Sequence, residues 1–399
     1  MDFDRVVDRG GTLSVKWDNP GNAPGKPDII PLWVADMDFP PPPAAVEAIA
    51  RRAAHPIYGY TRTPADYLEA VARWYAERLG AKVEPGSILM APSVMPAIGA
   101  AVRAFAAPDE AVIVMPPVYY PFFSIVRDNG RFLAEAPLAR SPEGAWSLDE
   151  RALDAAADAA QAQGHRPAAL LVSSPHNPVG RVWSKADANA MLAFCERRGL
   201  TLLCDEIHAD MILGDRPFRS LAAEDAGVVA FGGPNKTFNI AGLHISHVVA
   251  PREAERRVMK AALAALGSDS PNAFSIVAAR AAYLEGASWL DELLDYLRGN
   301  DRFLRAFMAE RLPGASAPPL EGTYLAWLDL RPILDRLGLA DESAFARRLE
   351  TEGRVKVSPG GIFGRGGEGH LRLNIACPRS TLAEGLERIA STVDAALLE

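Results

Sequence analysis

The chain has 399 residues, 49% of them hydrophobic and 23% charged, which is ordinary for a soluble globular enzyme and unlike a fibrous or disordered chain. Its net charge of −8 argues against a nucleic-acid-binding protein, because such a protein needs a basic surface. Three cysteines are too few for a disulfide framework or a zinc site. The sequence has neither the pattern of a signal peptide nor an apolar stretch long enough to span a membrane. We therefore expect a cytoplasmic protein with no membrane partner.

The N-terminal part predicts little regular structure. Residues 1–43 are rich in Asp, Gly and Pro, and we expect an irregular arm with one short strand in IPLWVAD. Amphipathic helices are predicted over 44–54 and 65–79, the second ending at Gly80.

From about residue 87 to 285, short apolar runs alternate with helical stretches. The runs are SILMA, EAVIVM, AALLVSS, LTLLCDE, GVVAFGG and HISHVVA, and helices are predicted over 95–106, 149–163 and 185–198. Continuous apolar strands separated by helices predict an α/β fold of three layers, in which helices cover both faces of a mostly parallel sheet.

The last hundred residues have a different pattern. They predict a long helix over 288–311, a strand in TYLAWLDL, a helix over 342–352, strands in RVKVS and HLRLNIA, and a final helix over 380–397. This pattern is typical of a small α+β domain. We therefore expect an arm with part of the small domain in 1–45, a large domain in 46–285, and the small C-terminal domain in 286–399.

Lys236 is the most informative single residue, because only 7 of the 42 basic residues are lysines. It follows the run GVVAFGG, and the nearest charges along the chain are Asp225 and Arg252. An amine in apolar surroundings has a lowered pKa, and the neutral amine is the form that attacks a carbonyl. Lys236 is therefore either a Schiff-base lysine or a loop residue whose head reaches water.

Polar residues follow several other predicted strands, at the edge where ligands bind to such sheets. Asp205 needs a cationic partner, such as a protonated pyridine nitrogen, unless it caps a helix or forms a structural ion pair. Asn177, in SSPHNPVG, either presents its amide to a site, with Pro178 and Gly180 fixing the backbone, or belongs to a plain turn.

Three further positions have both a functional and a structural interpretation. Ser93 opens a helix whose free amides favour an anion, although many helix starts look similar. Tyr119 could lie flat on a planar cofactor or pack in the core. Arg372, amid the apolar HLRLNIA, could bind a substrate carboxylate or a structural acid.

A metal hydrolase is the competing chemistry. Asp205, Glu206 and His208 form D-E-x-H, and His176 lies in a neighbouring loop. The HExxH spacing is absent, however, and successive side chains at a strand end point to opposite faces of the sheet. We therefore expect no metal.

Taken together, Asn177-Pro178-x-Gly180, Asp205 and Lys236 resemble the fold-type I PLP-dependent aminotransferase superfamily over nearly the whole chain. The stretches LWVADMDF, YGYT, PPVYYPF, SPHNPVGRVW, CDEIHADM and NKTFNIAGL are similar to its cystathionine β-lyase/C–S lyase branch (MalY/PatB type). His208 stands where ordinary aspartate aminotransferases carry a tyrosine, and His is typical of the lyase branch.

The resemblance implies pyridoxal 5′-phosphate as the cofactor and a role for each matching residue. Lys236 would form the Schiff base, Asp205 would pair with the pyridine nitrogen, and Asn177 would hold the phenolic oxygen of the ring. Tyr119 would stack on the ring beside His208. Ser93 and Val94 would lie at the phosphate, and Arg372 and Ala35 would bind the substrate. The resemblance also implies a homodimer in which Tyr60 reaches into the site of the neighbouring subunit.

The phosphate end departs from the family pattern. Gly233 lacks a hydroxyl that many aminotransferases direct at the phosphate, and His244 stands where they place an arginine. Relatives often have Gly in place of Ser93 and Ser in place of Asn235. Ser93 and Asn235 could compensate for the missing groups.

The resemblance favours α,β-elimination of a thiol from an S-substituted cysteine, with transamination as the alternative. Both reactions use the same residues, so the site alone does not choose between them. A PLP-binding regulator is the non-enzyme alternative, and it predicts an added docking or DNA-binding segment that the sequence does not display.

Overall fold

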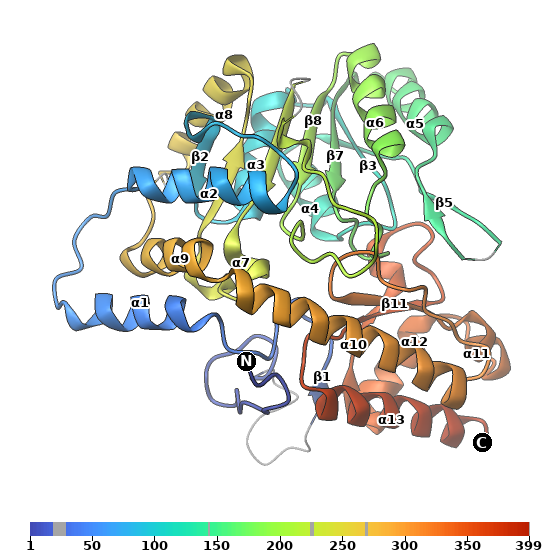
Figure 1. Cartoon of the computed structure of the whole chain (residues 1–399). Coiled ribbons are helices and arrows are strands. Elements are labelled where there is room, and N and C mark those ends of the chain that lie inside the picture. Colours follow the sequence, from blue (N-terminus) through green and yellow to red (C-terminus); the bar gives the residue numbers. More distant parts are fainter. Residues whose placement is uncertain (19–28, 143, 224–226, 268–269, 399) are drawn as a thin grey trace.

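The computed structural model describes residues 1–18, 29–142, 144–223, 227–267 and 270–398 (Figure 1). Asp225, one of the two charges that flank Lys236 along the chain, lies outside the described residues. Within these ranges, the helices are too short or too polar to cross a bilayer.

A seven-stranded sheet forms the centre of the larger part of the molecule. In spatial order its strands are β2 (Ile88–Ala91), β10 (Ser246–Val249), β9 (Val228–Gly232), β8 (Thr201–Asp205), β7 (Pro167–Ser173), β3 (Ala111–Val114) and β4 (Phe132–Glu135). The five strands from β9 to β4 are parallel, and β10 is antiparallel to both of its neighbours. The mostly parallel sheet predicted from the apolar runs is thus confirmed.

Helices cover both faces of this sheet, which makes three layers. One face carries α3 (Val94–Phe105), α4 (Pro121–Asp128) and α8 (Glu253–Ala265). The other carries α2 (Ala65–Arg78), α5 (Glu150–Ala162), α6 (Lys185–Arg198) and α9 (Ala273–Glu285). Along β3, Val112 and Val114 pack on the first face while Ala111 and Ile113 pack on the second, as the two-residue period of a strand requires.

Local sequence signals explain why the predicted helices begin and end within one residue of their expected bounds. The Asp149 carboxylate accepts hydrogen bonds from the first amides of α5. Ser184 and Asp187 form a capping box at the start of α6, which ends at Gly199 in the left-handed conformation. α1 (Pro43–Ala54) packs against α9.

The structure adds β4, α4, α8 and α9 to the predicted elements. β4 is an edge strand in which only Ala134 is buried, and its apolar run, Phe132 to Ala134, is limited to three residues. α9 is buried over most of its circumference and has no amphipathic pattern to detect.

A smaller unit follows, drawn in orange and red at the lower right of Figure 1. Its three-stranded antiparallel sheet has the order β11 (Leu325–Asp329), β14 (His370–Asn374), β13 (Ser358–Pro359). Its helices are α10 (Ala287–Arg311), α11 (Arg331–Arg336), α12 (Glu342–Arg348) and α13 (Arg379–Ala396). One π-helical turn, Leu349–Gly353, continues α12, so the helix predicted over 342–352 changes its pitch midway.

Two strand predictions in this part need correction. RVKVS is not one strand, because β12 (Val355–Lys356) pairs with β1 (Ile30–Pro31) while β13 pairs with β14. The strand expected in IPLWVAD is limited to the two residues of β1. A separate hairpin of β5 (Ala139–Arg140) and β6 (Trp146–Ser147) lies beside the large sheet. The domain bounds at residues 45 and 285 stay a prediction.

Candidate active site

The carboxyl ends of the parallel strands surround a cavity of about 370 Å³, here called the first cavity. β8 ends in Asp205, and Asn177, Lys236 and Tyr119 lie in the segments after β7, β9 and β3. All but two of the site residues predicted from the sequence line this cavity. Those lining the first cavity are Ala35, Ser93, Val94, Tyr119, Asn177, Asp205, His208, Asn235, Lys236 and His244.

Lys236 lies in α7 (Pro234–Thr237), a single helical turn directly after β9. Its Nζ donates a hydrogen bond to the carbonyl oxygen of Ala35. Burial lowers the pKa of the amine to about 8, although the nearby carboxylates of Asp36 and Asp205 act in the opposite direction. About a tenth of the amine is therefore neutral at pH 7, far more than for an unburied lysine.

Asp205 is a buried carboxylate whose Oδ1 accepts a hydrogen bond from the Ile207 amide at 3.1 Å. Burial raises its pKa to about 7, and no cation in the described part of the chain forms an ion pair with it. A protonated ring nitrogen beside Asp205 would supply the missing positive charge. The hydrogen bond from Ile207 closes a turn and does not cap a helix, because no helix of the described residues begins after β8 before residue 221.

His208 packs edge to face against Tyr324, with 5.7 Å between the ring centroids. Burial lowers its pKa to about 3, so the imidazole is neutral. Among the described residues, neither His208 Nδ1 nor Asn235 Oδ1 has a hydrogen-bond partner, although both atoms are buried. Buried polar atoms that line a cavity without partners fit a site completed by a ligand.

The loop after β7 holds Asn177 at the rim of the first cavity. The backbone N–H of Asn177 donates to Ser173 Oγ at 3.3 Å, and Trp183 Nε1 donates to the Ser173 carbonyl at 2.9 Å. Gly180 has a φ of 71°, and a Cβ there would lie 2.7 Å from Leu320 Cδ2, so this turn requires glycine.

Arg372 lies in β14 and joins the small sheet to this loop. Its Nη1 donates to Asn177 Oδ1 at 3.0 Å, and its Nη2 donates to the Trp33 carbonyl at 2.9 Å. The guanidinium also lies over the Phe363 ring, 4.8 Å from its centroid. Burial lowers its pKa to about 10, so it stays cationic at neutral pH. Within the described ranges no carboxylate pairs with it, which leaves a substrate carboxylate as the fitting partner.

Ser93 and His244 meet at the start of α3, with 3.3 Å between Ser93 Oγ and His244 Nδ1. Among the described contacts the Ser93 side chain caps no amide of α3, so the first amides of the helix are available to an anion. Gly233 has no room for the hydroxyl found in many aminotransferases, because a Cβ there would lie 3.1 Å from Ser246 Cα.

A second cavity, of about 470 Å³, shares Ala35, Tyr119 and Lys236 with the first. It extends past Arg372 toward α12 and β12. Lys236 therefore lies between the two cavities.

The segment 33–39 supplies backbone oxygens to the site, and the sequence gives no signal for this. Besides the Ala35 and Trp33 carbonyls, those of Val34 and Asp36 accept hydrogen bonds from Asn374 Nδ2, each at 2.6 Å. Backbone acceptors leave no mark on residue type, so only the fold reveals them.

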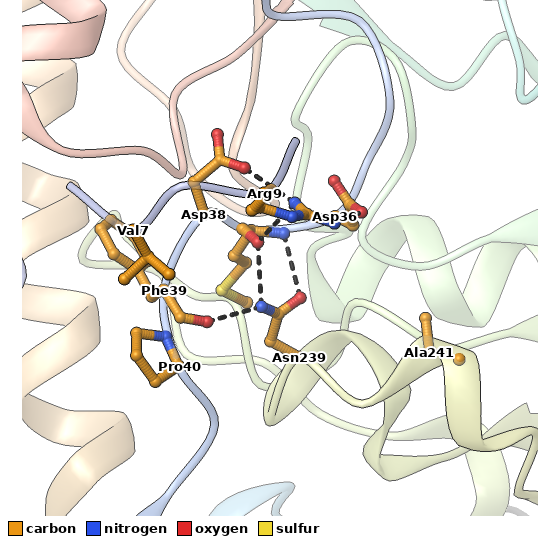
Figure 2. Close-up of a pocket in the computed structure, with 10 residues that line it drawn as sticks. Val7, Arg9, Asp36, Asp38, Phe39, Pro40, Asn239 and Ala241 are labelled. Carbon is orange, nitrogen blue, oxygen red and sulfur yellow. Dashed lines mark hydrogen bonds and ion pairs between the residues drawn. The ribbon is translucent and has the colours of Figure 1, made fainter. Parts of the chain in front are cut away.

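The N-terminal arm clamps this segment, as Figure 2 shows. Arg9 donates to Asp36 and Asp38, each at 2.8 Å, and Lys16 Nζ donates to Asp38 Oδ2 at 2.8 Å. On the other side, Asn239 Nδ2 donates to the carbonyls of Met37 and Phe39 at 2.9 and 2.7 Å. The arm thus fixes the segment that carries the hydrogen-bond acceptor of Lys236.

Tyr60 and Arg372 are the two predicted side chains outside the first cavity. Arg372 lines the second cavity, whereas Tyr60 is fully exposed in the connection between α1 and α2. Its expected reach into a neighbouring subunit stays a prediction.

The residues considered for a metal site have other contacts. His176 Nε2 donates to the Pro117 carbonyl at 2.9 Å. In the described parts of the chain, no three His, Cys, Asp or Glu side chains are grouped so that they could hold a metal ion.

Comparison with known proteins places this geometry in a family. Residues 27–389 match the model of aminotransferase class I and II. The chain belongs to this family. Cystathionine beta-lyase PatB of Bacillus subtilis is 39% identical, over 98% of this chain and all of the relative.

Two other proteins are similar to this chain over nearly their full length. Protein MalY of Escherichia coli is 32% identical, with 99% of both chains covered. The solved structure of cystalysin from Treponema denticola, which contains a pyridoxal 5′-phosphate cofactor, is 30% identical with a TM-score of 0.91 and 99% of both chains covered. The superfamily, the α/β fold and the PLP dependence expected from the sequence motifs are confirmed.

Proposed function

We propose that this protein is a PLP-dependent C–S β-lyase that cleaves L-cystathionine or another S-substituted L-cysteine into a thiol, pyruvate and ammonia. The observation that carries the proposal is the position of Lys236. This residue lines both the first cavity, with Asp205 and Asn177, and the second cavity, with Arg372. A cofactor in the first cavity and an amino acid in the second would meet at this amine.

The residues of the first cavity fit pyridoxal phosphate. Asp205 would pair with the ring nitrogen, Asn177 would hold the phenolic oxygen, and Tyr119 would lie on the ring. At the other end, the free amides of α3 at Ser93 and Val94 would hold the phosphate, with Asn235 and His244 beside them. When bound, the cofactor supplies an aldehyde that takes up the substrate amine and a cationic ring that accepts the electrons of the Cα–H bond.

The remaining steps belong to side chains of this chain. Arg372 binds the substrate carboxylate as a fork, and Ala35 lines the cavity beside it. This contact fixes which Cα bond of the substrate faces Lys236. The neutral Lys236 amine removes the Cα proton and holds it on Nζ. The thiolate then leaves Cβ with the electron pair of the C–S bond, and hydrolysis of the remaining fragment yields pyruvate and ammonia.

Transamination is the alternative, because it uses the same residues up to the proton transfer. Elimination is favoured by the lyase-type motifs and by the similarity to a cystathionine beta-lyase over the full length of both chains.

The test is incubation of the purified protein, loaded with pyridoxal phosphate, with L-cystathionine and no keto acid. We expect pyruvate and free thiol in equal amounts. A Lys236→Ala variant is the control and should lose at least about 10³-fold in rate, since it lacks the base. A protein that forms neither product from cystathionine or other S-substituted cysteines, but transfers amino groups to a keto acid, would be an aminotransferase instead.

We further propose a homodimer whose sites are shared between subunits. Ile57, Tyr58 and Tyr60 expose 70%, 56% and 112% of their surfaces in one short connection. Such a row of exposed apolar side chains fits an interface, and it would carry Tyr60 to the site of the neighbouring subunit as a catalytic and substrate-binding residue.

A further inference from the structure

The second cavity is larger than an α-amino-acid group requires. Arg372 and Lys236 at its near end serve the carboxylate and the Cα proton. The rest of the cavity continues to α12, the π-helical turn and β12, where its walls include Arg347, Glu350 and Lys356. This far end is the space available to the part of the substrate beyond sulfur.

The far end carries charges of both signs. Lys356 Nζ lies 2.9 Å from Glu350 Oε1 and 5.0 Å from the centroid of the Trp33 ring. The side chains of Lys356 and Glu350 are 23% and 35% exposed, so the ion pair is weak enough to rearrange around a ligand. Lys356 uses only Oε1, and the second oxygen of Glu350 is left for another donor.

Arg347 precedes Glu350 by three residues, one helical turn, and lines the same cavity. In the described part of the chain no carboxylate forms an ion pair with its guanidinium. The far end therefore has one carboxylate, from Glu350, one ammonium, from Lys356, and one guanidinium, from Arg347. These charges complement a ligand group that carries one ammonium and one carboxylate.

We propose that Arg347, Glu350 and Lys356 form a subsite for a second α-amino-acid group on the far side of the sulfur. Arg347 and Lys356 bind its carboxylate, and Glu350 binds its ammonium. The preferred substrates are then thioethers with an amino acid at each end, rather than cysteines with a neutral alkyl tail. The inference rests on the proposed lyase activity and names its substrate class.

A matched pair of substrates tests the subsite. L-Cystathionine and S-propyl-L-cysteine have the same thioether carbons, but only the first carries the distal ammonium and carboxylate. We expect the ratio of kcat/KM for cystathionine to that for S-propyl-cysteine to fall about tenfold in both Arg347→Met and Glu350→Gln, as loss of one charge-assisted hydrogen bond implies.

Arg348→Met is the control, because Arg348 is the next residue of the same helix but pairs with Glu352 at 2.7 Å and does not line the cavity. Its ratio should equal that of the unchanged protein. Calorimetric binding of L-cystathionine to the PLP-loaded Lys236→Ala protein, which does not turn it over, gives a second readout and should weaken about tenfold with Arg347→Met.

The outcomes separate the two proposals. If the unchanged protein cleaves both substrates and the ratio is the same in all variants, the subsite is wrong and the lyase stands. If it cleaves neither substrate, the lyase proposal fails and the subsite with it.

Discussion

At the scale of single residues, burial acts in opposite directions on two of the ionisable groups that line the first cavity. It lowers the pKa of Lys236 to about 8 and raises that of Asp205 to about 7, because it disfavours the charged form of each. The neutral amine is the form of Lys236 that acts as a nucleophile. The carboxylate form of Asp205 is stabilised when a cation lies beside it. The same dry pocket thus prepares both residues for a cofactor.

The pH dependence of cofactor loading follows from the Lys236 amine. Lys236 attacks the cofactor aldehyde only when neutral, so the loading rate of the apoprotein should rise about tenfold per pH unit below about 8 and level off above it. The measurement is the absorbance change on mixing with pyridoxal phosphate between pH 6 and 10. N-α-acetyl-lysine, an unburied amine, is the control and should still be rising at pH 10. A rise that continues past pH 10 in the protein would contradict the lowered pKa.

At the scale of elements, the single turn α7 fixes where the lysine lies. Gly233 lies between β9 and α7 and is close to Ser246 of β10. A Cβ atom on residue 233 would lie only 3.1 Å from Ser246 Cα. The glycine that looked like a missing phosphate contact therefore has a packing role. It lets α7 lie close to the sheet edge and so places Lys236 over the end of β8.

Gly233→Ala should destabilise the protein by about 1–3 kcal/mol, because backbone of β10 must move to admit the methyl group. Gly242→Ala is the matched control. A Cβ at Gly242 meets nothing within 4 Å, so the change should stay within about 0.5 kcal/mol. Urea denaturation of both variants measures the difference, and equal stabilities would show that Gly233 is not packed as described.

At the scale of the whole molecule, the site depends on segments far apart in the sequence. The segment 33–39 lies between the arm, α7 and β14, and it brings backbone acceptors to Lys236 and Arg372. The Asp38 carboxylate is central to this arrangement, because it accepts hydrogen bonds from Arg9, Lys16 and Trp17. Lys16 has only 1% of its surface exposed.

Asp38→Asn should cost about 3–5 kcal/mol, because it leaves the buried Lys16 ammonium without its closest carboxylate. It should also reduce lyase activity by loosening the segment that carries Ala35. Asp66→Asn, which breaks an exposed pair with Arg280, is the control and should cost no more than about 1 kcal/mol. Urea denaturation is the measurement. A loss in Asp38→Asn as small as in the control would mean that the arm is not held through Asp38.

The sequence by itself determined the elements whose signals are local. Apolar runs and capping residues predicted six of the seven large-sheet strands and most helices, and residues at strand ends predicted Asn177, Asp205 and Lys236 as neighbours. The signal failed for β4 and α9, since the edge strand has an apolar run of only three residues and the helix, buried over most of its circumference, has no amphipathic pattern.

Only the tertiary structure decided which groups these residues meet. It placed Arg372 beside Asn177 rather than beside a structural acid, gave Lys236 the Ala35 carbonyl, and gathered Arg347, Glu350 and Lys356 at the far end of the second cavity. The reason is physical: secondary structure follows from nearest neighbours along the chain, whereas burial, backbone acceptors and charge partners come from segments as much as 340 residues apart.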